Sequence, residues 1–586
     1  EVVPVEGKWK EAVPVLEQEL RRVLEYGFTN AELEEAKANL INQAEEAVKR
    51  KDTRRSAGIA MAFVNAIGGK KVFTTPERDL ELVKEALAKI SADECQKAFN
   101  EFWDTDDLSL VLTTSKPKED KAAELKALYE KSRKSEIAPP TGNELAPFAY
   151  TDFGPAGEVV ETTEIKDLEA TQLLLSNNIR VTYKQTDFQK NSISLSARFG
   201  GGQLSQPADT PGLDRFTSVI FQAGGLGQHS ADDLQRILAG RNVSVGLSIE
   251  EASFNLAGRT TPDDLELQLQ LMCASLTDPG FRPEAERMFK MSLPMLYNQL
   301  KHSMQGAMVE VTNYLHGGDF RFDLPSQEKF TSYTGEMARN WIMPAFQKAP
   351  MQLTLVGDFD PEVALPLIGK TFGALPERET EQKNFEERRK IDFPSRPDRK
   401  TFTFDSKIPN AAAMAVWKIP ATGKDVKTAR RFNLLASILS DRMREEIREK
   451  LGGSYSPRAG ASPSQELEVG FLQALAQVKP QETKKYGELM ISLADEMARE
   501  GVSQDELDRA LKPIQSGLKE SLRDNGYWLG TVLGESHDKP WKLDWARNRE
   551  ADYGSIKVEE LNALAKNYLH KKNALLFEII PNSEKE

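Results

Sequence analysis

Cysteine, long hydrophobic runs and positive charge are all in short supply in this sequence. Its 586 residues contain two cysteines, Cys95 and Cys273. Two thiols are too few for a disulfide framework or a zinc cluster, so we expect both to be ordinary buried residues. No apolar run approaches the roughly 18 residues that indicate a membrane-spanning helix, which argues against a membrane partner. The net charge of -13 argues against a nucleic-acid partner and favours cationic or neutral ones.

A helix–break–helix pattern occurs three times along the chain. The copy at Pro262–Lys290 has apolar residues at helical spacing, a break at Asp278-Pro279-Gly280, and a proline in the first turn of its second helix. The second copy, Tyr486–Lys512, breaks at Gly501 and restarts with a capping box. The third copy lies near the start of the chain and breaks at Gly27, followed by the capping box Thr29-Asn30-Ala31-Glu32. The repeated unit is a half-domain.

Each copy is followed at a similar distance by a short strand of alternating apolar residues. These predicted strands cover Leu108–Leu112, Met351–Leu355 and Leu575–Ile579. The second and third copies are separated by about the length of one domain. The first copy begins close to residue 1, without the strands that precede the other two. We therefore predict that the sequence starts within a domain.

The predicted elements divide the chain into five segments. Residues 1–116 are mostly helical, and residues 117–165 change to a charged run followed by proline- and glycine-rich stretches, which indicates a linker. Residues 166–376 form a complete unit, residues 377–400 are a second charged linker, and residues 401–586 repeat the order of the complete unit. Strands precede helices in each unit, which favours an α+β fold.

The complete unit begins with a hairpin and continues with further strands. The signals are Leu173–Tyr183 with Ser176-Asn177-Asn178 at the turn, then a strand at Ile193–Phe199 that runs into Gly200-Gly201-Gly202. A helix is predicted at about Gly212–Gln222, and two more strands lie between Val243 and Ala257. We therefore expect repeated domains, each with a mostly antiparallel sheet and helices on one face.

The Gly200-Gly201-Gly202 turn, Pro207 and Pro211-Gly212-Leu213 before a helix, together with the repeated half-domains, resemble the pitrilysin/insulinase family of zinc metallopeptidases, the inverzincins. In that family two homologous halves, each of two α+β domains, close around an unfolded peptide. The resemblance covers nearly the whole chain. It implies that residues 1–116 are the C-terminal part of a truncated second domain, that 117–165 is the linker between halves, and that 166–376 and 401–586 are the third and fourth domains.

The resemblance also implies where zinc is bound. The family's metal helix carries His-x-x-Glu-His, in which the histidines bind zinc and the glutamate activates water. The matching positions here are Arg215, Phe216, Thr217, Ser218 and Val219, so the motif is degenerate. The five histidines are scattered singly, at His229, His302, His316, His537 and His570. We expect zinc in the full-length enzyme, bound by a first domain outside this sequence, and no metal in this chain.

What the second half of such enzymes supplies is an arginine and a tyrosine that reach the substrate. The match is Arg448 and Tyr455 in the stretch Arg448–Tyr455, at the end of the long helix predicted for Thr428–Leu451. A cation and a phenol stabilise a developing oxyanion. The alternatives are that Arg448 only complements the helix C-terminus, as Arg444 would, and that Tyr455 is a half-buried sheet residue. His316, before two glycines, is interpreted as a loop histidine.

The resemblance implies a function in three parts. The chain is predicted to be the C-terminal portion of a zinc-dependent endopeptidase that encloses and cleaves unfolded peptides. Its partners would be a peptide or unfolded protein substrate and the N-terminal half of the same protein. The compartment is not indicated, although exported bacterial enzymes are one type within the family. The alternatives are a non-catalytic structural or partner subunit and a peptide-binding module.

Overall fold

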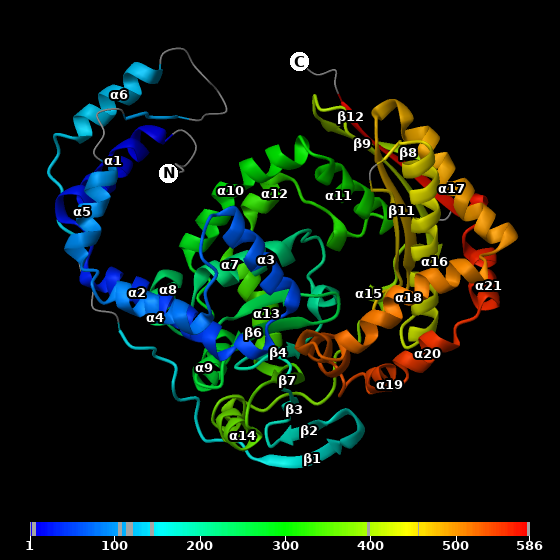
Figure 1. Ribbon diagram of the computed structural model, residues 1–586, viewed down its shortest axis with the longest axis horizontal. Coiled ribbons are helices and arrows are strands. Elements are labelled where there is room, and N and C mark those ends of the chain that lie inside the picture. The colour runs from blue at the N-terminus through cyan, green and yellow to red at the C-terminus, as the bar shows by residue number, and fades with distance from the viewer. Residues whose placement is uncertain are drawn as a thin grey trace. The chain divides into compact units, whose positions relative to one another are not determined.

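The computed structural model describes residues 2, 8–103, 108–112, 121–140, 146–394, 399–454 and 456–582. These residues fall into two compact units, which are treated separately below (Figure 1). The first unit comprises residues 1–149 with the short segments Gln189–Asn191 and Asp232–Asn242, and the second comprises the remainder. None of the helices in the described ranges is both long and apolar enough to cross a membrane.

The first unit is helical. Its helices are α1 (Trp9–Tyr26), α2 (Asn30–Lys49), α3 (Ser56–Gly68), α4 (Pro76–Leu87), α5 (Ala92–Trp103) and α6 (Lys121–Ser132). The predicted capping box is present, since Thr29 and Glu32 cap α2 reciprocally. Helix α6, from the predicted linker, packs on α1, where the Ser132 hydroxyl donates to the buried carboxylate of Glu17 at 2.5 Å.

The strand predicted at Leu108–Leu112 is wrong. Residues 108–112 are not part of any sheet, and the described parts of the first unit contain no other strand. The alternating leucines match the strand pattern, but a strand needs a partner to satisfy its backbone groups.

A seven-stranded sheet organises the first part of the second unit. Its strands are β1 (Val159–Ile165), β2 (Ala170–Leu175), β3 (Arg180–Gln185), β4 (Ile193–Phe199), β5 (Gly246–Ile249), β6 (Phe254–Thr260) and β7 (Met351–Gly357). The order is β1-β2-β3-β7-β4-β6-β5, and only β3 and β7 are parallel neighbours. The predicted hairpin is confirmed as β2 and β3. Strand β1 lies within the range predicted as a linker.

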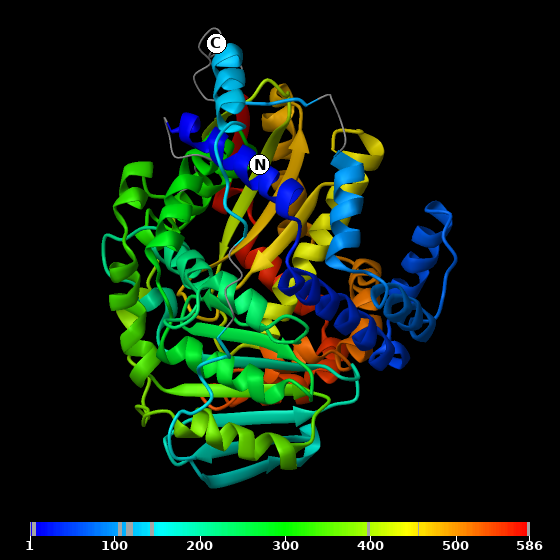
Figure 2. The same cartoon turned by 90° about the vertical axis from the view of Figure 1, so that its left-hand side faces the viewer.

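Helices cover one face of this sheet. Alternate side chains of β4 and β7, such as Leu195 and Leu353, are fully buried against them. The helices are α7 (Leu213–Gly224), α8 (Ala231–Ile237), α9 (Leu265–Thr277), α10 (Pro283–Lys301), α11 (Met304–Leu315), α12 (Gln327–Ser332), α13 (Gly335–Lys348) and α14 (Pro361–Lys370), of which α7, α9, α10 and α13 contribute most to this core. Figure 2 shows the sheet with β1 and β2 at its lower end.

The second sheet has five strands. They are β8 (Arg399–Asp405), β9 (Ala411–Ile419), β10 (Arg458–Ser462), β11 (Gly470–Val478) and β12 (Ala574–Asn582), in the order β10-β11-β9-β12-β8. Its helices are α15 (Glu386–Arg389), α16 (Val426–Met443), α17 (Thr483–Glu500), α18 (Gln504–Ser521), α19 (Trp541–Arg547), α20 (Arg549–Ser555) and α21 (Val558–Tyr568). The predicted α+β class with mostly antiparallel sheets is confirmed.

Each sheet is covered on its outer face by an element that belongs, in sequence, to the other sheet. Helix α11 precedes the five-stranded sheet, yet its Val311 and Leu315 pack with Phe577 and neighbours on that sheet's outer face. The π-helical segment η8 (Tyr527–Leu533) follows most of the five-stranded sheet. Its Trp528 and Val532 pack with Val356 on the outer face of the seven-stranded sheet. Both sheets are therefore buried on two faces.

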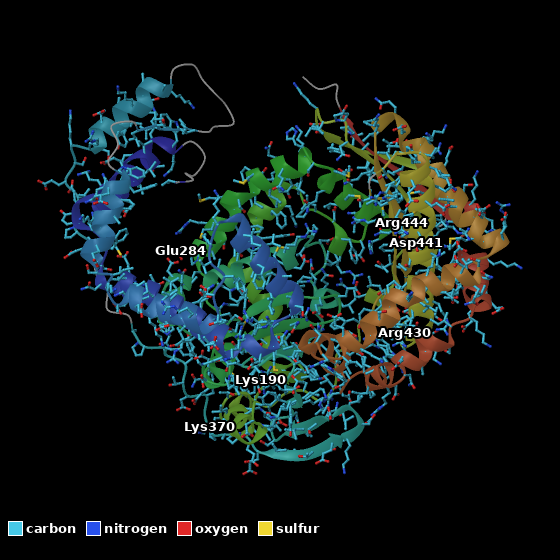
Figure 3. All side chains as sticks on the ribbon, viewed as in Figure 1. Lys190, Glu284, Lys370, Arg430, Asp441 and Arg444 are labelled. Carbon is cyan, nitrogen blue, oxygen red and sulfur yellow. The ribbon has the colours of Figure 1, made fainter. Side chains whose placement is uncertain are left out.

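We predict that Asp552→Asn destabilises the second unit strongly. Asp552 is 3% exposed and accepts hydrogen bonds from Arg430 at 2.8 Å and Arg431 at 3.1 Å, so its neutralisation leaves two buried cations without their anion (Figure 3 labels Arg430). Breaking such a pair typically costs about 3–5 kcal/mol. The measurement is the free energy of unfolding by denaturant. The control is Asp505→Asn in the exposed Asp505–Arg509 pair, for which we expect less than about 1 kcal/mol. Equal losses would contradict the prediction.

Candidate functional site

The predicted site residue Arg448 lies on an irregular turn. Helix α16 does not run regularly to Leu451, as predicted, but ends at Met443 and continues as a π-helical turn, Arg444–Lys450. Such turns are rare and occur frequently at functional sites. Ile447 is completely buried in the core beneath this turn, and the side chain of Arg448 is exposed. The buried isoleucine thus anchors the turn that presents the arginine.

The other cations near this turn have carboxylate partners. Arg442 donates to both carboxylate oxygens of Glu506, at 2.6 and 3.1 Å, and Glu506 also caps α18. Arg444 pairs with Asp441 at 3.1 Å, and both are labelled in Figure 3. Burial alone would raise the pKa of Glu506, but hydrogen bonds from Arg442 and Ser503 lower it to about 2. Arg442 therefore holds α16 to α18.

Two glycines carry the chain out of this turn. Gly452 adopts a φ of +60°, which favours glycine. Its N–H donates to the carbonyl of Arg448 at 3.2 Å, and the N–H of Gly453 donates to the carbonyl of Ile447 at 2.8 Å. These bonds cap the turn in the manner predicted from the sequence. Tyr455 lies outside the described residues, so the Arg448–Tyr455 pair stays a prediction.

Helix α7, at the positions of the family's metal motif, is built as a core helix. Phe216 and Thr217 are fully buried, and the ring of Phe216 meets Phe289 edge-on at 5.0 Å between centroids. The positions that would hold the three motif ligands are Arg215, Ser218 and Val219, which supply neither imidazole nor carboxylate. In the described part of the chain, no group of three or more His, Cys, Asp or Glu residues could hold a metal ion.

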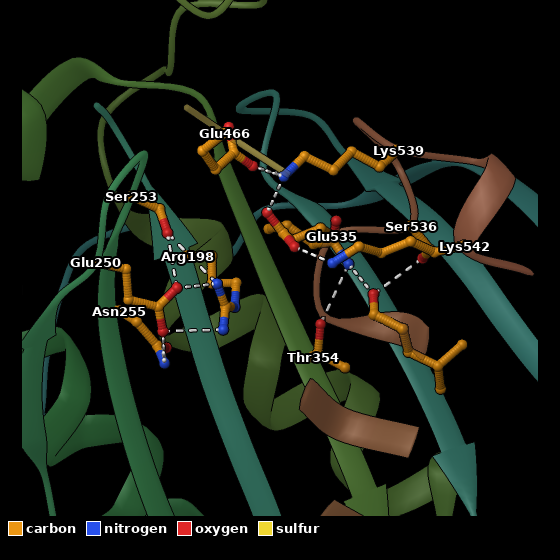
Figure 4. A network of polar contacts seen from close by, with 12 residues as sticks. Arg198, Glu250, Ser253, Asn255, Thr354, Glu466, Glu535, Ser536, Lys539 and Lys542 are labelled. Carbon is orange, nitrogen blue, oxygen red and sulfur yellow. Dashed lines mark hydrogen bonds and ion pairs between the residues drawn. The ribbon is translucent and has the colours of Figure 1, made fainter. Parts of the chain in front are cut away.

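A cluster of ion pairs joins segments that are distant in sequence, and sequence analysis missed it. Arg198 on β4 donates to Glu250 at 3.0 Å. Lys539, after η8, pairs with Glu535 at 2.7 Å and also with Glu466 from the β10–β11 loop (Figure 4). Two further cations, Lys542 and Arg389, contact Glu535 and Glu466 respectively. Only the spacing of Glu535, Lys539 and Lys542 could have been noticed in the sequence, and it does not identify the distant partners.

Electrostatics keeps the carboxylates of this cluster ionised. Burial would raise the pKa of Glu535, but attraction to Lys542 and Lys539 outweighs it and lowers the pKa to about 2. Burial likewise opposes ionisation of Glu466, and Lys539 and Arg389 lower its pKa despite this. The cluster therefore consists of charged pairs at neutral pH, placed where the outer face of the seven-stranded sheet meets the β10–β11 loop.

Comparison with known proteins gives one family match. Residues 332–514 match the family model described as the Peptidase M16 inactive domain. The chain is 21% identical over 543 residues to "Zinc protease PQQL-like" of Arabidopsis thaliana, a match that covers 87% of this chain and 53% of the relative. It is 20% identical over 595 residues to "Probable zinc protease PqqL" of Escherichia coli, covering 98% and 62%. The chain spans between 33% and 62% of the length of the curated relatives that it matches.

Solved structures give the same fold. The periplasmic protease PqqL of Escherichia coli has a TM-score of 0.65 at 18% identity, covering 98% of this chain and 63% of that one. The ferredoxin protease FusC, solved as a mutant in complex with Arabidopsis ferredoxin, has a TM-score of 0.69 at 17% identity, covering 100% and 64%. Together, these sequence and structure matches identify the chain as a member of the pitrilysin/insulinase family and place it in the family's C-terminal half.

We predict that Gly453→Ala disturbs the turn that carries Arg448. A Cβ atom at Gly453 would lie 2.0 Å from the ring of the buried Tyr486, and overpacking of this kind costs about 1–3 kcal/mol. The expected result is a lower free energy of unfolding by that amount. Gly460→Ala on β10 is the control, because a Cβ there meets nothing within 4 Å. A Gly453→Ala variant as stable as Gly460→Ala would show that the loop yields without cost.

We also predict a pH-dependent contribution from Glu535. Its folded-state pKa lies below the usual value of 4.5, so its stabilising effect is present above about pH 4.5 and is lost as the pH falls towards 2. The free energy of unfolding of Glu535→Gln should therefore differ most from that of the unaltered protein near neutral pH, and the difference should shrink between pH 4.5 and 2. A difference that is independent of pH would contradict the assignment.

Proposed function

We propose that this chain is the C-terminal portion of a zinc-dependent endopeptidase that encloses and cleaves unfolded peptides. In this proposal the chain supplies part of the wall of the substrate chamber and the residues Arg448 and Tyr455. The observation that carries the proposal is the exposed Arg448 on a π-helical turn, with a buried Ile447 beneath it. Arg442 and Arg444, the nearest alternatives in sequence, have carboxylate partners. The similarity to proteins named zinc proteases supports the same function.

The residues of this chain do not fit a zinc site. Arg215, Ser218 and Val219 occupy the ligand positions of the motif helix, and Phe216 and Thr217 between them are core residues. The proposal therefore assigns zinc and the water-activating glutamate to a different part of the full-length protein. The five-segment division, with a truncated second domain at 1–116 and third and fourth domains at 166–376 and 401–586, belongs to the same proposal.

Arg448 and Tyr455 would act on charge that appears during peptide hydrolysis. Attack on the scissile carbonyl converts its oxygen into an oxyanion, and a guanidinium and a phenol O–H directed at that oxygen stabilise it. Ground-state carbonyls carry little charge, so these donors contribute mainly in the transition state. The π-helical turn and the two glycines position both residues within one short segment, which fixes the arginine before substrate arrives.

A non-catalytic partner subunit is the second candidate. The observation that favours it is the match of residues 332–514 to a domain described as inactive. The two candidates differ in one property of the full-length protein, namely whether it contains an intact His-x-x-Glu-His helix. Hydrolysis of an unfolded protein by the full-length, zinc-loaded polypeptide is expected for the peptidase, and its absence would remove support from the first proposal.

We predict that Tyr455→Phe in the full-length protein lowers kcat more than it raises KM. Loss of one oxyanion donor typically costs about 3 kcal/mol, or roughly 10²-fold in rate, and a group used in the transition state acts on kcat. Arg448→Lys should lower kcat in the same direction. The control is Arg444→Lys, one turn earlier and equally exposed, which should leave kcat unchanged. An unchanged kcat for Tyr455→Phe would remove Tyr455 from the mechanism.

A further inference from the structure

A cavity of about 650 Å³ lies in the second unit, between the two sheets. Its walls come from the β5–β6 turn, from α11 and the residues that follow it, and from the β10–β11 loop. The polar lining residues include Arg198, Glu250, Glu251, His316, Ser464 and Glu466. Phe322, Val469 and Phe471 supply apolar walls. Its volume falls in the range of about 300–1,000 Å³ that is usual for ligand pockets.

The charges that line this cavity are paired with one exception. Arg198 is matched by Glu250, and Lys542 by Glu535. Glu466 is held by Lys539 and Arg389. Glu251 forms no ion pair with any described residue. Burial and repulsion by Glu466 raise its pKa, against the weaker opposing effects of Arg321, Ser464 and Arg389. One carboxylate thus lines the cavity without a counter-charge.

His316 adds a second, independent acceptor. Its side chain lies in the wall of the same cavity, is 8% exposed, and stacks on Phe322 with ring centroids 3.7 Å apart. Its Nδ1 lies 2.7 Å from the carbonyl oxygen of Thr312. Because a carbonyl only accepts, Nδ1 carries the proton, and in the neutral ring Nε2 is then an acceptor. Within the described ranges, Nε2 has no hydrogen-bond partner. Burial lowers the pKa of His316, which keeps the ring neutral.

We propose that this cavity is a subsite for a guanidinium or ammonium group on an aliphatic stem, namely a basic side chain of an extended peptide. Glu251 supplies the counter-charge, His316 Nε2 accepts a hydrogen bond, and Phe322 and Phe471 flank the stem. The choice of a peptide as the source rests on the function proposed above. The cationic chemistry rests only on the cavity.

The specificity of such a subsite follows from its donors and acceptors. An unpaired carboxylate and a fixed lone pair both require a donor, and a positively charged donor also replaces the solvation that burial removes from Glu251. An anion would meet Glu251 and Glu466 at close range and is excluded. A neutral side chain of the same shape would fill the cavity but leave the carboxylate unpaired.

The test uses the 586-residue chain itself and needs neither zinc nor hydrolysis. Two fluorophore-labelled pentapeptides are compared by fluorescence anisotropy, Gly-Ala-Arg-Ala-Gly and the same peptide with citrulline, the neutral analogue of nearly equal shape, in place of arginine. We expect the arginine peptide to bind about tenfold more tightly or better, since a hydrogen bond to a charged group is worth more than one between neutral groups. Equal affinities, or no binding of either peptide at millimolar concentration, would overturn the proposal.

Two variants assign the effect to the cavity. Glu251→Gln should remove the preference for arginine over citrulline, and His316→Phe, which keeps the stack on Phe322, should reduce it. The matched control is Glu310→Gln, because Glu310 is an exposed carboxylate on the same helix that lines a different hollow, and it should retain the full preference. A preference that survives Glu251→Gln in a folded variant would overturn the assignment.

The source of the cation is separated by a third ligand. Free argininamide carries the same guanidinium without the peptide, and we expect it to bind at least about tenfold more weakly than the arginine pentapeptide. Binding as tight as the peptide's would overturn the assignment to a peptide and leave a site for a small amine. Failure of hydrolysis in the full-length protein, by contrast, would count against the peptidase proposal and not against the cavity.

Discussion

The structure of the second unit depends on the exchange of two helical elements between its sheets. Helix α11 covers the outer face of the five-stranded sheet, where Val311 and Leu315 meet Phe577. The π-helical segment η8 covers the outer face of the seven-stranded sheet, where Trp528 meets Val356. A sheet buried on both faces must satisfy its polar groups internally. Gln352 on β7 illustrates this, because its side-chain amide donates to the carbonyl of Leu533 in η8.

The ion-pair cluster is a consequence of this exchange. Once η8 lies on the seven-stranded sheet, the chain that follows it brings Glu535, Lys539 and Lys542 to the seam beside Arg198 and the β10–β11 loop. Charges enclosed at such a seam are costly unless they are paired. The pairs therefore contribute more to the choice of this arrangement over others than to the net stability. They also leave a cavity beside them, because paired side chains at the rim pack less densely than an apolar core.

Local patterns were sufficient to predict much of this fold. The strand at Ile193–Phe199 is observed with the same ends, and the capping boxes at Thr29 and Ser503 are formed as predicted. These features depend on residues within a few positions of one another. The strand at Leu108–Leu112 failed because pairing, not alternation, makes a strand. The π-helical turn after Met443 and the crossing of α11 and η8 also escaped prediction, since each is fixed by contacts with distant segments.

The candidate site divides in the same way. The glycines at 452 and 453 could be predicted to end a helix, but not that Gly453 lies against Tyr486. The lack of metal ligands on α7 was legible, and the structure adds the physical reason that the helix persists. Phe216 and Thr217 are core residues there, so the helix is retained for packing after its chemistry is lost. A domain kept in this way retains walls, edges and cavities that can hold a peptide. It follows that selectivity for substrate can reside in the half of the protein that performs no metal chemistry, and unpaired groups such as Glu251 and His316 are where such selectivity would be found.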